Sequence, residues 1–244
     1  MLVSGLYLHL MLMLAALLPS AVLLVQVYRL DSIEKEPKGL LLGLAGAGAL
    51  AGTAACAAEM GLFYLLRICM PGRSLARLLI ENFLIVGLLE EACKFLPVRW
   101  LTWRHTAFNY QFDAVVYCVC VALGFAALEN ILYVGQYGFV TALTRGLLAV
   151  PGHFFFAVYM GVSLGEAKRT ELRQKKLLVE VTDGKMRYLI EALAVPALLH
   201  GFWDFSLTSG SRVMAAVFYV FVLAFFADAF LRLRHAAQGD APLV

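Results

Sequence analysis

The chain has 244 residues, of which 62% are hydrophobic and 15% charged, and its mean hydropathy is +0.81. Soluble domains contain about 45–50% apolar and about 25% charged residues. A soluble enzyme, a disordered chain and a disulfide-stapled secreted domain are therefore excluded. The net charge of +3 is too small to indicate nucleic acid as a partner, and we expect the lipid bilayer to surround the chain instead.

Seven apolar segments are long enough to cross a bilayer, which takes about 20 mostly apolar residues. They lie at 3–28, 39–60, 78–101, 112–135, 140–165, 187–208 and 213–233. We therefore predict an all-α, polytopic bundle of about seven transmembrane helices that forms one domain over residues 1–244. Between the spans, we expect a short interfacial helix within the amphipathic segment 61–77 and a cytoplasmic helix or loop at 166–186.

Basic residues predict the orientation of this bundle. Most of them fall in or beside the loops on one side: Arg29, Lys35, Lys38, Arg99, Arg104, Lys168, Arg169, Arg173, Lys175, Lys176, Lys185, Arg187, Arg232 and Arg234. The positive-inside rule makes that side cytoplasmic. With an odd number of spans, the N-terminus then lies outside and the C-terminus inside.

Ionisable and strongly polar groups also occur inside the predicted spans, where they are costly and usually functional. They are Glu90, Glu91 and Lys94 in the third span, Glu129 and Asn130 in the fourth, Arg145 and His153 in the fifth, and His200 and Asp204 in the sixth. At a rise of about 1.5 Å per residue, Glu90 and His153 fall within ~1 Å of their span centres, and His200 about 4 Å outward. Three helices thus bring ionisable groups to one depth, which predicts a common site.

Helical spacing indicates how these groups pair. Glu90 and Lys94 are four residues apart and share a helix face, as do His200 and Asp204. Adjacent Glu90 and Glu91 point about 100° apart, so they cannot face one cavity equally. We expect one carboxylate to act as a general base, while the other is held by Lys94 or a neighbouring helix. The sequence leaves open which one is the base, and its depth favours Glu90.

In this order on successive spans, the motifs resemble the PrsW family of intramembrane proteases, in the wider clan of type II CAAX prenyl endopeptidases. The resemblance rests on the acidic loop 31–37 (DSIEKEP), Glu90-Glu91-x-x-Lys94, Asp113 with Gly124–Asn130 (GFAALEN), Arg145–His153, and His200-x-x-x-Asp204. It covers most of the chain. One departure is Asp204, since the prenyl endopeptidases have Asn there.

The resemblance implies a peptide hydrolase in the bacterial inner membrane, with a single-pass anti-sigma factor as its substrate in a stress response. It also implies that Glu90 with His153 activates water, and that His200 with Asp204 supports the tetrahedral intermediate. Asp204 would be protonated or would orient His200. Glu91 remains a catalytic candidate, and the supporting residues are Lys94, Glu129, Asn130 and Arg145.

Metal binding is the rival chemistry. We predict no cofactor, because the chain lacks a His-Glu-x-x-His helix and a Cys-x-x-Cys pair. If the chemistry is metal-dependent, Glu90, His153 and His200 would be the zinc ligands.

Two further alternatives are a non-proteolytic scaffold of the same fold and a proton-coupled transporter. Transporters usually contain two related halves, and the sequence has no such repeat.

Overall fold

The computed structural model describes residues 2–177 and 182–243, and it is 86% helical. The elements are α1 (Leu2–Leu30), α2 (Lys38–Cys69), α3 (Leu75–Leu79), a π-helix η1 (Ile80–Leu88), α4 (Leu89–Thr102), α5 (Asp113–Tyr137), α6 (Phe139–Leu147), α7 (Ala149–Leu177), α8 (Thr182–Thr208) and α9 (Arg212–Gln238). These ranges contain no strand, apart from an isolated bridge between Tyr110 and Pro242. The predicted all-α membrane bundle is confirmed.

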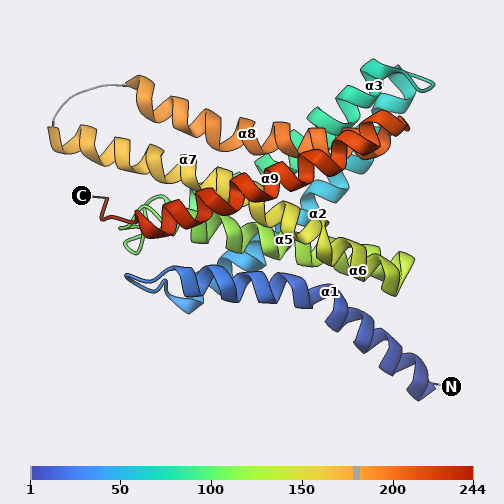
Figure 1. Ribbon diagram of the computed structural model, residues 1–244, viewed down its shortest axis with the longest axis horizontal. Coiled ribbons are helices and arrows are strands. Elements are labelled where there is room, and N and C mark those ends of the chain that lie inside the picture. Colours follow the sequence, from blue (N-terminus) through green and yellow to red (C-terminus); the bar gives the residue numbers. More distant parts are fainter. Residues whose placement is uncertain (1, 178–181, 244) are drawn as a thin grey trace.

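Five helical segments of the described chain are long and apolar enough to cross a membrane: Leu10–Leu30, Lys38–Cys69, Asp113–Tyr137, Phe139–Leu177 and Arg212–Gln238. The two other predicted spans correspond to α8 and to the rod formed by α3, η1 and α4 (Figure 1). Both contain several of the ionisable residues, which makes them less apolar. The protein is therefore a multi-pass membrane protein.

Helix boundaries differ from the prediction in three places. Gly61–Cys69 continues α2 rather than forming an interfacial helix, and the chain turns only near Pro71 and Gly72, whose φ is +90°. Segment 166–177 extends α7, while residues 178–181 of the predicted loop lie outside the described residues. The predicted span 140–165 is divided at Leu148 into α6 and α7. Pro151 lies in the first turn of α7, where proline is tolerated, so the break precedes it.

Helix α5 forms the centre of the bundle, between α1, α2 and α7 (Figure 1). All residues from Ala114 to Leu123 are buried. A Cβ atom added to Gly48 would lie 2.0 Å from the Val121 carbonyl oxygen, and one added to Gly124 would lie 2.0 Å from that of Ala45. Glycine at both positions therefore lets the backbones of α2 and α5 touch. Small residues commonly allow such close approach between membrane helices.

The two ends of the bundle differ in charge and connections. One end holds the loop 31–37, the end of α7 and the C-terminal tail; the other holds the turns before α3, α6 and α9 (Figure 1). The basic residues that predict the orientation gather at the first end. The predicted active-site residues lie toward the second.

Candidate active site

A π-helix and two glycines determine how Glu90 and His200 meet. The π-helix η1 ends two residues before Glu90, and π-helical segments are rare and often lie at functional sites. A Cβ atom on Gly87 would lie 2.6 Å from the Ala197 carbonyl oxygen, and one on Gly201 would lie 2.6 Å from the Phe83 ring. Because neither glycine has a side chain, α8 packs directly against η1 and α4. The contact lies close to the site, since Gly201 follows His200 directly and Gly87 lies three residues before Glu90.

Glu90 and Glu91 have different surroundings. The Lys94 ammonium Nζ lies 3.1 Å from Glu90 Oε2 and 2.7 Å from Glu91 Oε1. Glu91 is 0% exposed and contributes no atom to the cavity described below, whereas Glu90 is 6% exposed and lines it. Lys94 thus compensates both carboxylates, and only Glu90 is presented to a ligand.

His200 is held on α8 by two carboxylates. Its Nδ1 lies 2.9 Å from Glu91 Oε1, so Nδ1–H donates to that oxygen. Its Nε2 is then the ring nitrogen that faces the cavity, 3.3 Å from Asp204 Oδ2 and 3.9 Å from Glu90 Oε2. Phe156 stacks on the ring with 4.9 Å between ring centroids. Glu91 therefore holds the ring of His200 in place and keeps a proton on its Nδ1.

His153 occupies the first turns of α7 and is engaged on both sides. Its Nδ1 lies 3.0 Å from Lys94 Nζ, and its Nε2 lies 2.9 Å from Glu129 Oε2. Because an ammonium can only donate, Nδ1 accepts and the proton on Nε2 is donated to Glu129. Arg145 pairs with the same Glu129 oxygen at 2.9 Å. Arg145 Nε also donates to Asn130 Oδ1 at 3.0 Å.

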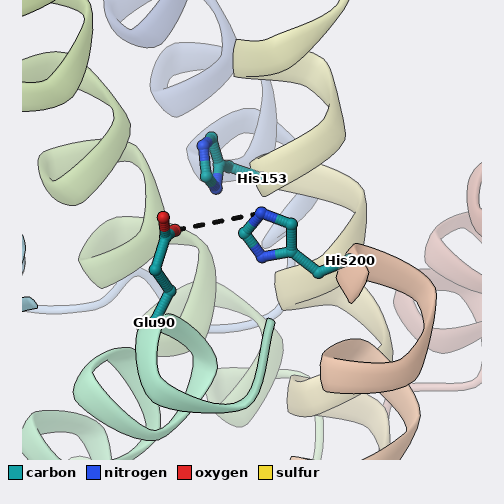
Figure 2. Close-up of side chains that lie close together, drawn as sticks. All are labelled: Glu90, His153 and His200. Carbon is teal, nitrogen blue, oxygen red and sulfur yellow. Dashed lines mark ion pairs between the residues drawn. The ribbon is translucent and has the colours of Figure 1, made fainter. Parts of the chain in front are cut away.

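All nine residues predicted for the site therefore lie in one polar network, which is continuous from Asn130 and Arg145 through Glu129, His153, Lys94, Glu90 and Glu91 to His200 and Asp204. One detail differs from the expected pairing of Glu90 with His153. Lys94 lies between these two side chains and contacts both. Figure 2 shows Glu90, His153 and His200 pointing toward one another from α4, α7 and α8.

A cavity of about 730 Å³ opens beside this network. Its lining includes Glu90, Glu129, His153, His200 and Asp204. Ligand pockets in proteins commonly measure about 300–1,000 Å³. The cavity opens to the outside of the bundle, because its lining includes exposed side chains such as Tyr219, which is 67% exposed. The carboxylate and the two imidazoles are thus reachable by water and by a peptide segment.

Sequence reasoning missed a carboxylate that lines this cavity from α2, Glu59. A predicted span that ends at residue 60 puts Glu59 at a membrane boundary, whereas α2 continues to Cys69 and places it within the helix. The signal was present, because no other charged residue lies between Lys38 and Arg67. An isolated carboxylate in such a helix is a functional candidate by default.

The donor atoms of Glu90, His153 and His200 lie within 4.8 Å of one another. One carboxylate and two imidazoles form a donor set that catalytic zinc sites use. The surroundings fit a metal less well, because Lys94 Nζ is already within hydrogen-bond distance of two of these residues. The ammonium supplies the positive charge that a metal ion would otherwise bring to Glu90.

A helical membrane bundle with a carboxylate and two imidazoles around an internal cavity has the construction of an intramembrane hydrolase. The comparison with known families agrees. Residues 36–230 match the sequence model of the PrsW family, described as intramembrane metalloproteases. The chain therefore belongs to the PrsW family of intramembrane proteases, and it is a peptidase.

Curated relatives of the same family cover most of the chain. Protease PrsW of Geobacillus kaustophilus is 31% identical over 81% of this chain and 80% of its own length. Protease PrsW of Halalkalibacterium halodurans is 33% identical over 66% of this chain and 70% of its own length. The Oceanobacillus iheyensis protein of the same name is 29% identical over 92% and 95%. No solved structure matches the chain significantly.

Proposed function

We propose that this protease is a glutamic-type endopeptidase, in which Glu90 activates the attacking water without a metal ion. The observation that carries the proposal is the contrast between the two adjacent carboxylates: Glu90 lines the cavity, whereas Glu91 is enclosed by Lys94 and His200. Glu91 is then a positioning residue. The experiment below tests this division.

The spacing of the donors accommodates one water molecule. Between three atoms that lie within 4.8 Å of one another, a water oxygen can reach each at a hydrogen-bond distance of about 2.6–3.2 Å. Glu90 would accept a proton from this water while the hydroxyl oxygen bonds to the carbonyl carbon of the substrate. When the C–N bond breaks, Glu90 would return the proton to the leaving amine.

His200 is suited to the oxygen that becomes negative during this attack. In the protonated imidazolium form, His200 would donate Nδ1–H to Glu91 and Nε2–H to the oxyanion, and such donors typically contribute about 2.7–4 kcal/mol to transition-state stabilisation. Asp204 Oδ2, 3.3 Å from Nε2, would orient the ring as an acceptor. His153, whose ring nitrogens are engaged by Lys94 and Glu129, would form the wall of the cavity beside the water.

A metal-dependent mechanism is the second candidate, favoured by the clustered donors and by the description of the family. Glu90, His153 and His200 would then hold the ion, which would supply Lewis-acid activation of water. For this to happen, Lys94 would have to leave His153 Nδ1. We therefore favour the metal-free alternative.

The expected substrate is a single-pass membrane protein, and the class implied by the family resemblance is an anti-sigma factor. The cavity opens toward the end of the bundle opposite the basic residues. With the basic end in the cytoplasm of a bacterial inner membrane, the N-terminus outside and the C-terminus inside, cleavage would take place near the outer leaflet.

The test uses the purified full-length protein in liposomes that contain a single-pass peptide substrate. Because a general base typically contributes about 10²–10⁴-fold, we expect Glu90→Gln to lower cleavage by that factor. The matched control is Asp228→Asn, which changes an exposed carboxylate that pairs with Arg232 on α9. Equal cleavage by wild type and Glu90→Gln would contradict the assignment.

Chelation separates the two mechanisms. We expect the cleavage rate to stay unchanged after treatment with a strong zinc chelator, and elemental analysis of the purified protein to find less than one metal ion per chain. Activity that disappears with the chelator and returns with added zinc would establish the metal-dependent alternative.

A further inference from the structure

The wall that α2 contributes to the cavity consists of small residues followed by a carboxylate. Gly52, Ala55, Cys56, Glu59 and Phe63 line the cavity from this helix. Their spacing of three or four residues places them on one helix face. The first three fill little volume, so there is space along α2 for a peptide segment, and Glu59 lies beside that space.

Glu59 differs from every other carboxylate that lines the cavity. Each of the others has a cation or an imidazole within 4 Å: Glu81 has Arg77, Glu90 has Lys94, Glu129 has Arg145, and Asp204 has His200. Glu59 has no such partner among the described residues, and its Oε1 is shielded from solvent without a hydrogen bond. Glu59 as a whole is partly buried, and shielding one of its carboxylate oxygens without a partner is costly. Glu59 is therefore left for a group that the protein itself does not supply.

The charge balance of the site indicates the chemistry of that group. Five carboxylates (Glu59, Glu90, Glu91, Glu129 and Asp204) face two permanent cations, Lys94 and Arg145. If all five carboxylates are ionised, the excess is three negative charges with neutral imidazoles, and it is still one with both imidazoles protonated. A divalent ion with neutral imidazoles would also leave an excess of one. Under each of these conditions the site lacks a positive charge.

We propose that Glu59 is a specificity-determining residue that binds a Lys or Arg side chain of the substrate close to the scissile bond. This inference rests on the proposed proteolytic function. Glu59 lines the same cavity as Glu90 and His200, so a basic side chain held by it would lie in the space that the reacting groups face. A guanidinium or ammonium bound to a carboxylate also forms one of the stronger hydrogen bonds in proteins.

The test uses single-pass peptides that differ at one position. A Lys, Arg, Met or Glu residue is placed in turn at each of six consecutive positions of a flexible segment at the outer end of the peptide helix. One hydrogen bond to a charged group typically strengthens binding by about 10- to 100-fold. We expect wild type to cleave the best Lys and Arg peptides faster than the Met peptide by about this factor.

Variants of Glu59 identify the residue responsible. Glu59→Gln should cleave Lys and Met peptides equally, at the wild-type rate for the Met peptide, and Glu59→Lys should prefer the Glu peptide. The matched control is Glu81→Gln, which changes another carboxylate of the cavity lining, already paired with Arg77 at 2.7 Å; it should keep the preference for Lys. A uniform loss of cleavage in Glu59→Gln for all peptides would instead indicate proton transfer and overturn the proposal, as would a wild type without preference for basic peptides.

A binding measurement keeps this inference separate from the proposed function. Fluorescent Lys and Met peptides are titrated against Glu90→Gln and against Glu90→Gln/Glu59→Gln in liposomes. Tighter binding of the Lys peptide to the first variant only would support the role of Glu59, even if wild type cleaved no peptide. Failure of wild type to cleave any peptide would count against the proposed function, and equal binding of the two peptides would count against Glu59.

Discussion

Carboxylates that are buried or partly buried lie near both ends of α5, and their partners differ. At its start, Asp113 Oδ2 accepts backbone N–H groups of Asn109 and Tyr110 at 3.0 and 2.7 Å. Nearby, Glu36 Oε2 accepts the Tyr117 hydroxyl at 2.5 Å. Toward its other end, Glu129 pairs with side chains only, an imidazole and a guanidinium. We refer to Asp31, Glu36 and Asp113 as the loop carboxylates.

Carboxylates therefore have two different roles in this protein, one in holding loops and one in the active site. The loop carboxylates accept from backbone and hydroxyl groups, which hold the loops 31–37 and 103–112 against α5. The site carboxylates are joined through Lys94, His153 and His200 beside a cavity. Imidazoles can accept and release protons near neutral pH, whereas a backbone N–H cannot. Burial of a carboxylate therefore does not by itself indicate catalysis.

The largest effect in this comparison is expected from Lys94→Met. Removal of one partner from a buried ion pair typically costs about 3–5 kcal/mol, and Glu90 and Glu91 would both lose the ammonium that pairs with them. We expect this loss in the free energy of unfolding, measured by thermal or denaturant unfolding in detergent micelles. The double variant Lys94→Met/Glu91→Gln should recover part of it; no recovery would show that the ammonium does not stabilise the fold through Glu91.

His200→Ala should act on the reaction more than on the fold. Loss of an oxyanion donor typically lowers kcat about 10²–10³-fold, and we expect that reduction with little change in KM. The matched control is His235→Ala, since His235 lies on α9 outside the cavity lining. Equal reductions for both histidines would contradict the role of His200.

Gly201→Leu tests whether close helix packing aligns the site. Its side chain would push α8 away from Phe83, and a displacement of about 1 Å at an active site can cost about 10²-fold in rate. Gly43→Leu provides the control, because a Cβ atom at Gly43 has no neighbour within 4 Å. We expect cleavage to fall strongly for the first variant only, as measured with the same single-pass peptide.

Asp113→Ala is expected to have the smallest effect and to act on stability alone. The loop N–H groups of Asn109 and Tyr110 would lose their acceptor, and a typical intramolecular hydrogen bond contributes about 0.5–1.5 kcal/mol. The measurement is thermal unfolding together with cleavage per folded molecule. A large loss of cleavage at unchanged stability would mean that the loop carboxylates contribute to the reaction and do not serve the structure alone.

The sequence by itself determined that the chain forms a helical membrane bundle and which segments of it are helical. These properties depend on length, hydropathy and the helical rise, which act within one segment. The same arithmetic placed Glu90, His153 and His200 at similar levels and paired His200 with Asp204. It failed where local packing changed the helix ends, as at Leu148 and Cys69.

Only the tertiary structure decided which atoms face one another. The π-helix and the contact between Gly87 and Gly201 set the rotation of α4 against α8, and this rotation presents Glu90 to the cavity while Glu91 is enclosed. The position of Lys94 between Glu90 and His153 depends on how α4 packs against α7. Such relations arise from packing between helices, which hydropathy and spacing along one helix do not contain.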